Sequence, residues 1–330
     1  MRLPTGREIS AGIDYARALT GYIARSDRAT GGPVSVAIEP ANICNLRCPQ
    51  CATGSNSLTR PKGCMSFDAF KLIIDSLPSS VCELYLWGQG EPFLAPDFLR
   101  MVGYASSRGF KTIVSTNGHF LDNPEEIVSS GLDVLIVSLD GVDEDTYTSY
   151  RVGGNFSRVV NGIKCVAGVI ARNNHGPAIE LQYLVTRENA GDIGAFKSLA
   201  LSIGVHRVVI KTMQVISLEE GSSVLPDDMN YTRYRKNNSR KLETNRSWYL
   251  KNRCLRLYYS FQIDWQGNVV PCCFDKNSEN IMGNIFREPV THIWNNEKYR
   301  SFRNILNIQG RMLPMCRNCT EGLKRKTLHA

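Results

Sequence analysis

The sequence lacks any long uninterrupted run of apolar residues. No stretch reaches the roughly 18 residues that a helix needs to cross a bilayer, so no transmembrane segment is expected. The N-terminal region also lacks the compact apolar core of a signal peptide, which predicts a cytoplasmic location. No base-reading module is recognisable, and aromatic residues are sparse among the basic ones, so nucleic acid is not expected as a partner.

Cysteine, by contrast, is abundant for a chain without an export signal. Eleven cysteines among 330 residues indicate metal ligation in a reducing compartment, not disulfide bonds. Apolar residues make up 42 % of the chain, which is ordinary for a globular protein. The length leaves room for two domains.

The positive charge of the chain is concentrated in one segment. Residues 231–256 hold nine basic side chains and one acidic one, so this segment alone sums to +8, the formal net charge of the whole chain. Two readings stay open. The segment is either a solvated connector or a patch for an anionic partner, such as a phosphorylated substrate, an acidic peptide or a lipid headgroup.

Between residue 33 and about residue 215, strand and helix patterns alternate. Short, β-branched, nearly all-apolar runs predict strands at 33–40, 82–87, 111–116, 133–139, 179–186 and 206–212. Helical periodicity lies between them at 67–77, 96–108, 123–130, 155–172 and 190–203. Strands that are apolar on both faces are typical of a covered parallel sheet. The predicted fold class is therefore α/β, a partial (β/α)6 parallel barrel.

Further elements are predicted on either side of this repeat. An amphipathic helix over residues 6–28 is expected to dock on the body of the protein through Ile9, Ile13, Ala16, Leu19 and Ile23. A membrane-surface role is the alternative. Near the C-terminus, Trp265-Gln266-Gly267 predicts a hairpin turn. A helix is predicted over 288–307, with a buried side of Ile293, Trp294, Tyr299, Phe302 and Ile305.

Three cysteines follow the first predicted strand at short spacing. Cys44, Cys48 and Cys51 form a C-x3-C-x2-C loop, and thiolates select zinc or iron–sulfur clusters. A [4Fe–4S] cluster normally takes four cysteines, so a set of three leaves one iron open, and we expect the chemistry there. The alternatives are a zinc knot or three unrelated buried cysteines, although zinc motifs usually run in C-x2-C pairs with a fourth ligand.

Polar residues follow the next three predicted strands. Strand two runs into Gly88-Gln89-Gly90-Glu91-Pro92, whose glycines permit close approach of a ligand and whose Glu91 can bind an ammonium group. Strand three ends at Ser115-Thr116-Asn117-Gly118, and strand four ends at Ser138, with Arg151 beyond it. An arginine beside a hydroxyl suits a carboxylate, so these strand ends together predict a site for an amino-acid moiety. For each residue alone, a turn or a cap is the alternative.

A second set of cysteines lies near the C-terminus, at Cys254, Cys272, Cys273, Cys316 and Cys319. The last two form a C-x2-C pair, which can close a four-sulfur site with two thiolates from the hairpin region. Zinc is the alternative occupant of such a site. Adjacent side chains point to opposite faces of an extended strand, so only one of Cys272 and Cys273 is expected to be a ligand.

These motifs resemble the radical S-adenosylmethionine (SAM) superfamily. The three-cysteine loop, Gly90-Glu91-Pro92 and Ser115-Thr116-Asn117-Gly118 match it in order and placement. The C-terminal part is similar to a SPASM/twitch extension, because Cys254 is followed after twelve residues by Gly267 and after four more by Cys272. The longer seven-cysteine pattern is incomplete, which implies a single auxiliary cluster.

The resemblance implies roles for the matching residues. A SAM-binding [4Fe–4S] cluster would be held by Cys44, Cys48 and Cys51. SAM would be contacted at its amine by Glu91, beside Gly90, at its carboxylate by Ser138 and Arg151, and at its ribose by Thr116 and Asn117. An auxiliary [4Fe–4S] cluster would be held by Cys254, Cys272, Cys316 and Cys319. The implied domains are a helical segment at 1–32, the radical SAM barrel at 33–215, a polar basic connector at 216–253 and a SPASM/twitch-like domain at 254–330.

The implied activity is that of an oxidoreductase or modifying enzyme. An external one-electron reductant of the flavodoxin or ferredoxin type would drive cleavage of SAM, and the 5′-deoxyadenosyl radical would take a hydrogen from an unidentified substrate, an anionic compound or a peptide. No catalytic residue is indicated by the sequence. The alternatives are a radical epimerase, in which a cysteine such as Cys64 or Cys273 returns a hydrogen atom, and an iron–sulfur electron carrier without a substrate.

Overall fold

The computed structural model describes residues 4–205, 207–217, 223–237, 242–244, 253–310, 313–319 and 326–329. The chain forms two compact units. Unit 1 comprises Met1–Ile43, Thr59–Ile113 and Ser247–Glu321, and unit 2 comprises Cys44–Leu58, Val114–Arg246 and Gly322–Ala330. The three-cysteine loop therefore belongs to unit 2, whereas the residues that precede and follow it in the chain belong to unit 1.

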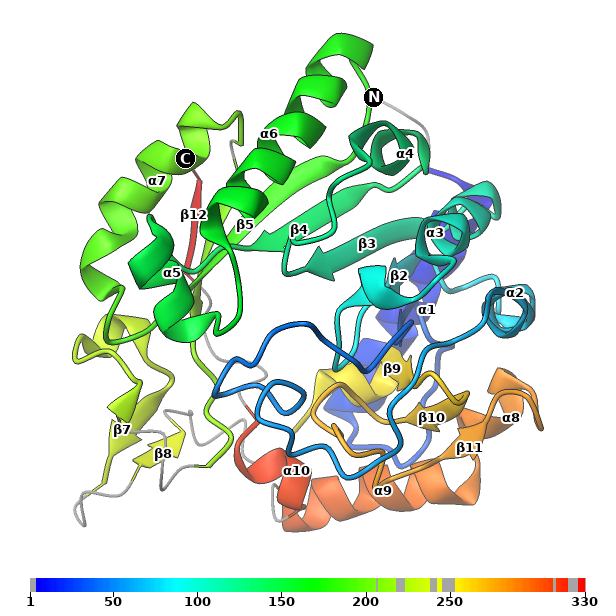
Figure 1. The fold of residues 1–330 in the computed structure, drawn as a ribbon. Coiled ribbons are helices and arrows are strands. Elements are labelled where there is room, and N and C mark those ends of the chain that lie inside the picture. The colour runs from blue at the N-terminus through cyan, green and yellow to red at the C-terminus, as the bar shows by residue number, and fades with distance from the viewer. Residues whose placement is uncertain are drawn as a thin grey trace. The chain divides into compact units, whose positions relative to one another are not determined.

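The sheet of unit 1 is built around its first strand. Its strands are β1 (Ser35–Ile38), β2 (Glu83–Tyr85), the first half of β3 (Lys111–Thr116), β9 (Ser260–Ile263), β10 (Asn268–Val270) and β11 (Gly283–Asn284). Strand β2 lies parallel to β1 and to β3. Strand β9 lies parallel to β1 on its other side, and β10 and β11 continue from it in antiparallel pairing. The predicted C-terminal hairpin is confirmed as β9 and β10, which Figure 1 shows next to β11. Through β9 it extends the sheet that contains β1.

The helices of unit 1 are mostly short. They are α1 (Gly6–Ile23), α2 (Phe67–Ser76), η1 (Pro92–Leu94), α3 (Phe98–Ser107), η6 (Leu255–Tyr258), α8 (Val290–Ile293), α9 (Glu297–Gln309) and α10 (Pro314–Arg317). Helix α2 shows how the sequence builds them. The Ser66 hydroxyl caps it by accepting a hydrogen bond from Ala69 N, and the apolar periodicity buries Phe70, Ile73 and Ile74.

The helix predicted over 288–307 is interrupted. Helix α8 ends at Ile293, and Asn296 starts α9 by accepting a hydrogen bond from Tyr299 N. The buried face of α9 also includes Arg303, whose guanidinium donates to the backbone carbonyls of Leu257 and Trp294. A capping asparagine therefore overrides the continuous periodicity.

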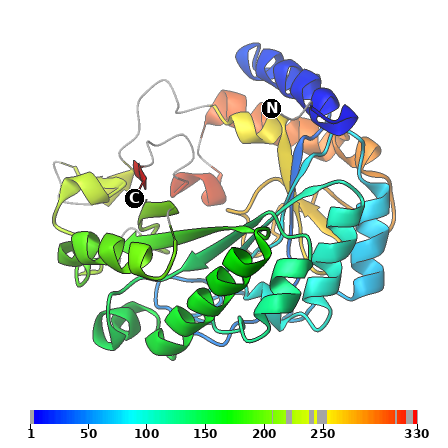
Figure 2. The same cartoon turned by 90° about the horizontal axis from the view of Figure 1, so that it is seen from above.

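Helix α1 packs through a different face from the one that was predicted. The isoleucines Ile9, Ile13 and Ile23 are 52 %, 51 % and 66 % exposed. Its buried residues are the small ones, Ala11, Ala18 and Gly21. A Cβ added at Gly21 would lie 3.2 Å from the Tyr258 ring. The prediction was wrong because η6 supplies the bulk at this contact, which leaves room only for small side chains on α1; Figure 2 shows α1 in blue beside η6 in yellow.

Unit 2 has parallel strands of its own. Its strands are the second half of β3, β4 (Val134–Ser138), β5 (Ala178–Val185), β6 (Arg207–Thr212) and β12 (Lys326–His329), in that order, with a separate hairpin of β7 (Tyr234–Lys236) and β8 (Leu242–Thr244). Strands β4, β5 and β6 are parallel, and β12 is antiparallel to β6. All six predicted barrel strands are present, so the α/β fold with a six-stranded parallel sheet is confirmed.

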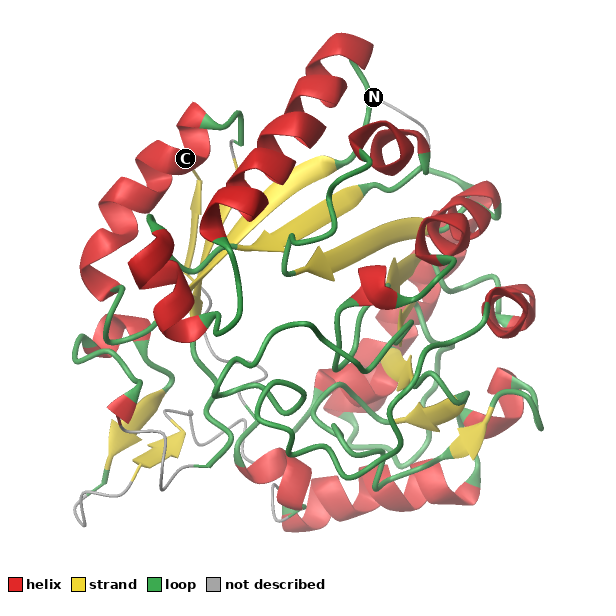
Figure 3. Cartoon of the chain, viewed as in Figure 1, coloured by secondary structure: helices red, strands yellow, loops and turns green. Residues whose placement is uncertain are grey.

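Helices alternate with these strands along the chain (Figure 3). In unit 2 they are α4 (Pro124–Ser129), α5 (Glu144–Tyr150), α6 (Phe156–Asn173), η2 (Ala190–Asp192), α7 (Ile193–Ser202) and η4 (Met229–Tyr231). Helix α5 was not predicted, because its seven residues carry no apolar repeat. Its capping box explains it, since the Asp143 carboxylate accepts from Thr146 N and the Thr146 hydroxyl accepts from Asp143 N.

Within the described ranges, no helix is long and apolar enough to cross a membrane. Part of the basic segment 231–256, namely residues 238–241 and 245–252, lies outside the described residues.

The packing of α1 can be tested by a pair of substitutions. Ala18 is fully buried, so Ala18→Leu overpacks the contact and is expected to lower the free energy of unfolding by about 1–3 kcal/mol. Ile13→Gln changes an exposed position and is expected to stay within about 0.5 kcal/mol of the wild type. Urea unfolding of the two variants measures both values. A larger loss in Ile13→Gln than in Ala18→Leu would reverse the assignment of the buried face.

Candidate functional site

The three-cysteine loop is held within unit 2 by backbone and apolar contacts. Arg47 N donates to the carbonyl of Val152 at 2.9 Å, and Cys51 N donates to the carbonyl of Cys48 at 3.2 Å. Leu46 N donates to Cys44 Sγ at 3.4 Å. These hydrogen bonds within unit 2 therefore fix the shape of the loop without a contribution from a ligand.

The surroundings of the loop are apolar. A buried cluster in unit 2 comprises Leu46, Cys48, Tyr150, Met213, Val215, Leu225 and Tyr234, and Cys44 and Cys51 pack against it. Burial raises the pKa of the Cys48 thiol to about 11, although the positive charge of Arg151 opposes that rise. Binding iron at Cys48 would therefore be coupled to release of the thiol proton.

Arg151 is paired with a carboxylate of the chain itself. Its Nε donates to Asp140 Oδ2 at 2.5 Å, and its Nη1 lies 3.8 Å from Cys48 Sγ. Asp140 is almost completely buried and also accepts a hydrogen bond from Leu184 N at 2.7 Å. The guanidinium thus bridges a buried carboxylate and one sulfur of the loop. Ser138, the other residue predicted to bind the SAM carboxylate, is the half-buried last residue of β4.

Asn117 contacts the loop at Cys44. Its Nδ2 donates to Asn45 Oδ1 at 2.8 Å and lies 3.7 Å from Cys44 Sγ. Its Oδ1 accepts from His119 N and faces His119 Nδ1, both at 3.0 Å. Because His119 Nε2 accepts from Asn155 N, the proton of the neutral ring is assigned to Nδ1. Burial lowers the pKa of His119, which favours this neutral form.

Two further side chains of unit 2 accept hydrogen bonds from backbone N–H groups. The buried Thr116 hydroxyl accepts a hydrogen bond from Gly118 N at 3.0 Å. Gln50 Oε1 accepts a hydrogen bond from Ile216 N at 2.8 Å. Thr116 and Asn117, which the resemblance places at a ribose, hold the turn and the loop in this structure.

The Gly-rich turn after β2 lies in unit 1. A Cβ at Gly90 would lie 2.5 Å and 2.6 Å from the carbonyl oxygens of Ala41 and Ile43, so only glycine fits against this backbone. Glu91 N donates to the carbonyl of Ile43 at 2.8 Å. The buried Glu91 carboxylate accepts from Phe93 N at 3.2 Å and caps η1. The turn is thus packed directly on the residues that lead into the three-cysteine loop.

Four of the C-terminal cysteines come together in unit 1. One small cavity is lined by Cys254, Leu257, Cys272, Phe274, Phe302, Leu306, Met315, Cys316 and Cys319. Cys273, the rival of Cys272, is half-buried and is not among these residues. None of the eleven cysteines forms a disulfide bond in the described residues. Four thiols within apolar walls fit the donor set of an iron–sulfur cluster.

Burial, reinforced by the neighbouring Cys273 and Cys254, raises the pKa of the Cys272 thiol well above its ordinary value. Ligation at Cys272 would therefore be coupled to proton release, as at Cys48. Across the residues that the structure describes, no three His, Cys, Asp or Glu side chains meet closely enough to hold a single metal ion.

Sequence reasoning missed Asp140, Asn45 and His119. Asp140 sits two residues beyond Ser138 and eleven before Arg151, and that spacing was the available signal for an internal ion pair. The hydrogen bond between Asn45 and Asn117 joins residues 72 positions apart, so no local sequence pattern predicts it.

Two family models match the chain. One, described as the radical SAM superfamily, matches residues 38–174. The other, SPASM, described as an iron–sulfur cluster-binding domain, matches residues 254–320. Together they span the three-cysteine loop and the four-cysteine cavity.

Curated relatives are similar at low identity. The tungsten-containing aldehyde ferredoxin oxidoreductase cofactor-modifying protein of Pyrococcus furiosus is 25 % identical over 313 residues, 86 % of each chain. The AdoMet-dependent heme synthase of Methanosarcina barkeri is 28 % identical over 53 % of this chain and 49 % of its own. The mycofactocin maturase MftC of Mycobacterium ulcerans is 28 % identical over 56 % and 48 %. The chain thus spans about half the length of the latter two relatives.

Solved structures share the fold. Streptococcus suis SuiB bound to its precursor peptide SuiA has a TM-score of 0.63 at 15 % identity, with 92 % of this chain and 73 % of the other covered. BtrN in complex with AdoMet and 2-DOIA has a TM-score of 0.53 at 20 % identity, covering 88 % and 94 %. At these identities the likeness establishes the fold alone.

The four-cysteine cavity predicts a defined iron content. With one cluster at each cysteine set, anaerobically reconstituted protein should hold about eight irons per chain, four per cluster. Cys316→Ala combined with Cys319→Ala should lower this to about four, measured as protein-bound iron. Four irons and one zinc in the wild type would contradict a second cluster.

Controls sharpen this test. Cys82→Ala combined with Cys165→Ala removes two cysteines that line neither set and should leave about eight irons. By electron paramagnetic resonance (EPR), Cys272→Ala should alter the auxiliary signal and Cys273→Ala should not. The reverse pattern would exchange the two cysteines as ligands.

The Asp140–Arg151 pair predicts a large cost for a small change. Asp140→Asn leaves a buried cation without its carboxylate and should lower the free energy of unfolding by roughly 3–5 kcal/mol. Asp122→Asn is the matched control, because Asp122 pairs with Arg158 on the surface and should cost at most about 1 kcal/mol. Denaturant titration of the two variants compares them, and equal losses would refute a special role for the buried pair.

Proposed function

The chain belongs to the radical SAM superfamily and carries a C-terminal SPASM domain, and from that premise we propose that it cleaves SAM reductively and abstracts a hydrogen from a substrate that remains unidentified. The chain is an enzyme of this family. The outcome that we propose is an oxidation or modification assisted by the auxiliary cluster.

The observation that carries the proposal is the set of donors aimed at the loop sulfurs. Cys44 Sγ lies 3.7 Å from Asn117 Nδ2, and Cys48 Sγ lies 3.8 Å from Arg151 Nη1. Hydrogen bonds and positive charge beside cluster sulfurs stabilise the thiolate form and shift the reduction potential. A purely structural trio of cysteines has no need of such donors.

We propose the following division of work among the residues. When bound, the cluster and SAM supply a 5′-deoxyadenosyl radical, which is the chemistry that the protein must contain. Glu91 receives the SAM amine, with Gly90 keeping the turn close. The remaining proposed contacts are Ser138 and Arg151 for the carboxylate, and Thr116 and Asn117 for the ribose. The buried apolar cluster around Cys48 excludes water from this region.

The C-terminal cysteines are proposed to hold an auxiliary cluster that exchanges electrons with the substrate. Four thiolates leave no open iron for SAM, so this site cannot duplicate the first one. Phe302 and Leu306 contribute apolar side chains to the lining of the cavity. The reductant is proposed to be of the flavodoxin or ferredoxin type. A reducing, cytoplasmic setting is proposed from the cysteine-rich sequence.

The relatives suggest a class of substrate but do not identify one. Their names describe modification of a cofactor, synthesis of heme and maturation of mycofactocin. We propose an anionic compound or a peptide as substrate, on the basis of the basic segment 231–256 and this range of relatives. An epimerase is the second candidate. It is favoured by the half-buried Cys64 and Cys273, which lie outside the proposed ligand sets and could return a hydrogen atom.

The proposal is tested by SAM cleavage. Reduced wild-type protein should form 5′-deoxyadenosine from SAM, and Cys48→Ala should form none, because only two loop thiolates remain. Cys165→Ala, the same substitution at an exposed cysteine, is the control and should match the wild type. Glu91→Gln should keep the cluster and weaken SAM binding about tenfold, since a charge-assisted hydrogen bond is lost. Wild-type protein that holds iron but forms no 5′-deoxyadenosine would favour the electron carrier instead.

A further inference from the structure

Residues Thr59–Gly63 lie beyond the three-cysteine loop, where the chain re-enters unit 1, and are held by the C-terminal part of that unit; we call them the exit segment. Thr59 N donates to Asn277 Oδ1 at 2.9 Å. Arg60 Nε donates to the carbonyl of Lys276 at 2.7 Å. Trp265 Nε1 donates to the carbonyl of Pro61 at 3.2 Å. Three of its five residues are therefore hydrogen-bonded to the segment that also carries the auxiliary cysteines.

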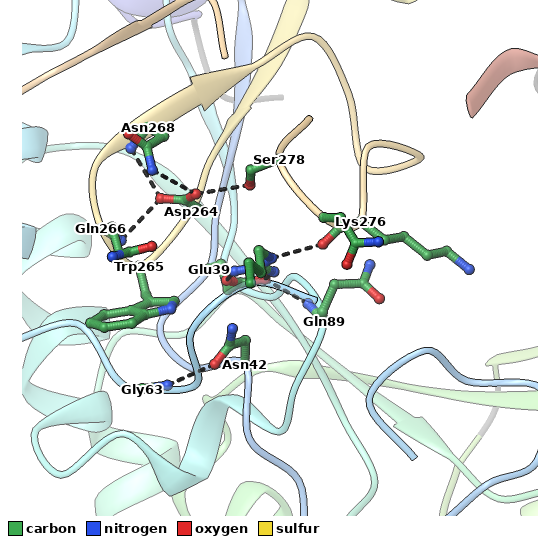
Figure 4. A network of polar contacts seen from close by, with 12 residues as sticks. Glu39, Asn42, Gly63, Gln89, Asp264, Trp265, Gln266, Asn268, Lys276 and Ser278 are labelled. Carbon is green, nitrogen blue, oxygen red and sulfur yellow. Dashed lines mark hydrogen bonds and ion pairs between the residues drawn. The ribbon is translucent and has the colours of Figure 1, made fainter. Parts of the chain in front are cut away.

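The exit segment is also joined to the entrance of the loop. Asn42 lies two residues before Cys44, and its Nδ2 donates to the carbonyl of Pro61 at 2.7 Å. Its Oδ1 accepts from Gly63 N at 2.8 Å, and its own backbone N donates to the Gly63 carbonyl at 3.1 Å. One asparagine thus ties the two ends of the loop together, as Figure 4 shows for Asn42 and Gly63.

At the centre of these contacts lies a buried ion pair. Arg60 Nη1 and Nη2 donate to Glu39 Oε1 and Oε2, both at 2.6 Å. The side chains are 6 % and 0 % exposed. A two-bond fork between a guanidinium and a carboxylate fixes orientation as well as distance, which a lysine cannot do. The pair therefore locks a residue before the loop to a residue after it.

Glu39 extends the same network to the Gly-rich turn. Its Oε2 also accepts a hydrogen bond from Gln89 N at 2.8 Å (Figure 4). A Cβ at Gly88 would collide with that carboxylate, so glycine is required beside it. The turn that carries Gly90 and Glu91 is thereby positioned by the same carboxylate that receives Arg60.

We propose that Glu39 and Arg60 are positioning residues for SAM binding. Their pair holds together the two ends of the three-cysteine loop and the turn that carries Glu91. Through the Lys276 carbonyl and Asn277, it also makes this arrangement depend on the C-terminal segment. The inference rests on the proposed function, because it concerns the SAM site of that reaction. Neither residue needs to touch SAM for this role.

The first arm of the test uses the protein without clusters. Arg60→Lys keeps the charge and loses the fork, so amide hydrogen exchange in residues 59–63 and 88–91 should accelerate about tenfold or more. Lys111→Gln is the control, since it removes an exposed ion pair with Glu83 in the same unit and should leave both segments protected. Unchanged exchange in Arg60→Lys would overturn the proposal whether or not the enzyme cleaves SAM.

The second arm measures SAM affinity in reconstituted protein by equilibrium dialysis. Arg60→Lys and Glu39→Gln should raise the Kd for SAM about tenfold, with the iron content kept. The spectrum of the auxiliary cluster should stay unchanged. An unaltered Kd in both variants refutes the positioning role. A wild-type protein that binds no SAM refutes the proposed function instead, and the exchange experiment still decides the inference.

A milder variant guards against loss of folding. Asn277→Ala removes only the hydrogen bond to Thr59 N, so the protein should remain folded while the exchange of residues 59–63 and the Kd for SAM rise severalfold. In a double-mutant cycle with Arg60→Lys, the two changes should be non-additive because they loosen the same segment. Strict additivity, or no effect of Asn277→Ala on either measurement, would show that the C-terminal segment does not help to hold the exit segment.

Discussion

A carboxylate that is buried at the end of a strand needs an opposing charge and further hydrogen bonds, and both units meet this requirement with an arginine. In unit 1, Glu39 follows β1 and receives the fork of Arg60. In unit 2, Asp140 lies just beyond β4 and receives Arg151. Each carboxylate also accepts a backbone N–H, from the turn after β2 or from β5. Removing one partner would leave a buried charge without its counter-ion. Each ion pair therefore fixes the strand end that carries the proposed chemistry.

The two pairs serve the three-cysteine loop in different ways. Arg60 follows the loop in the chain and holds its exit near its entrance, whereas Arg151 places positive charge beside Cys48. Apolar surroundings disfavour the ionised form of the loop thiols, as the raised pKa of Cys48 shows. The guanidinium beside it offsets part of that cost. The two arginines therefore contribute both to the structure around the loop and to its proposed chemistry.

Much of the fold could be predicted because buried parallel strands and amphipathic helices leave local patterns. The strands of the barrel and the hairpin at Trp265 follow from residue patterns. The grouping of Cys272 with the other auxiliary cysteines was implied by the resemblance to the SPASM motif, and the cavity that they line agrees with it. Long-range partnership was less accessible. A carboxylate for Arg151 was expected from the ligand, and the chain supplies one as Asp140. The buried face of α1 was misjudged because Gly21 and two alanines, not its isoleucines, meet the bulky side chains of η6. The pairing of β9 with β1 leaves no periodic signal in either strand.

The central claim is that SAM binds directly to the cluster of the three-cysteine loop. The most direct measurement uses the variant that lacks Cys316 and Cys319, so that a single cluster contributes to the EPR spectrum after reduction. The spectrum is recorded before and after SAM is added. Coordination of SAM to the open iron predicts a clear change in the g values, and the same addition to Cys48→Ala protein should produce none. Superimposable spectra with and without saturating SAM would contradict the account.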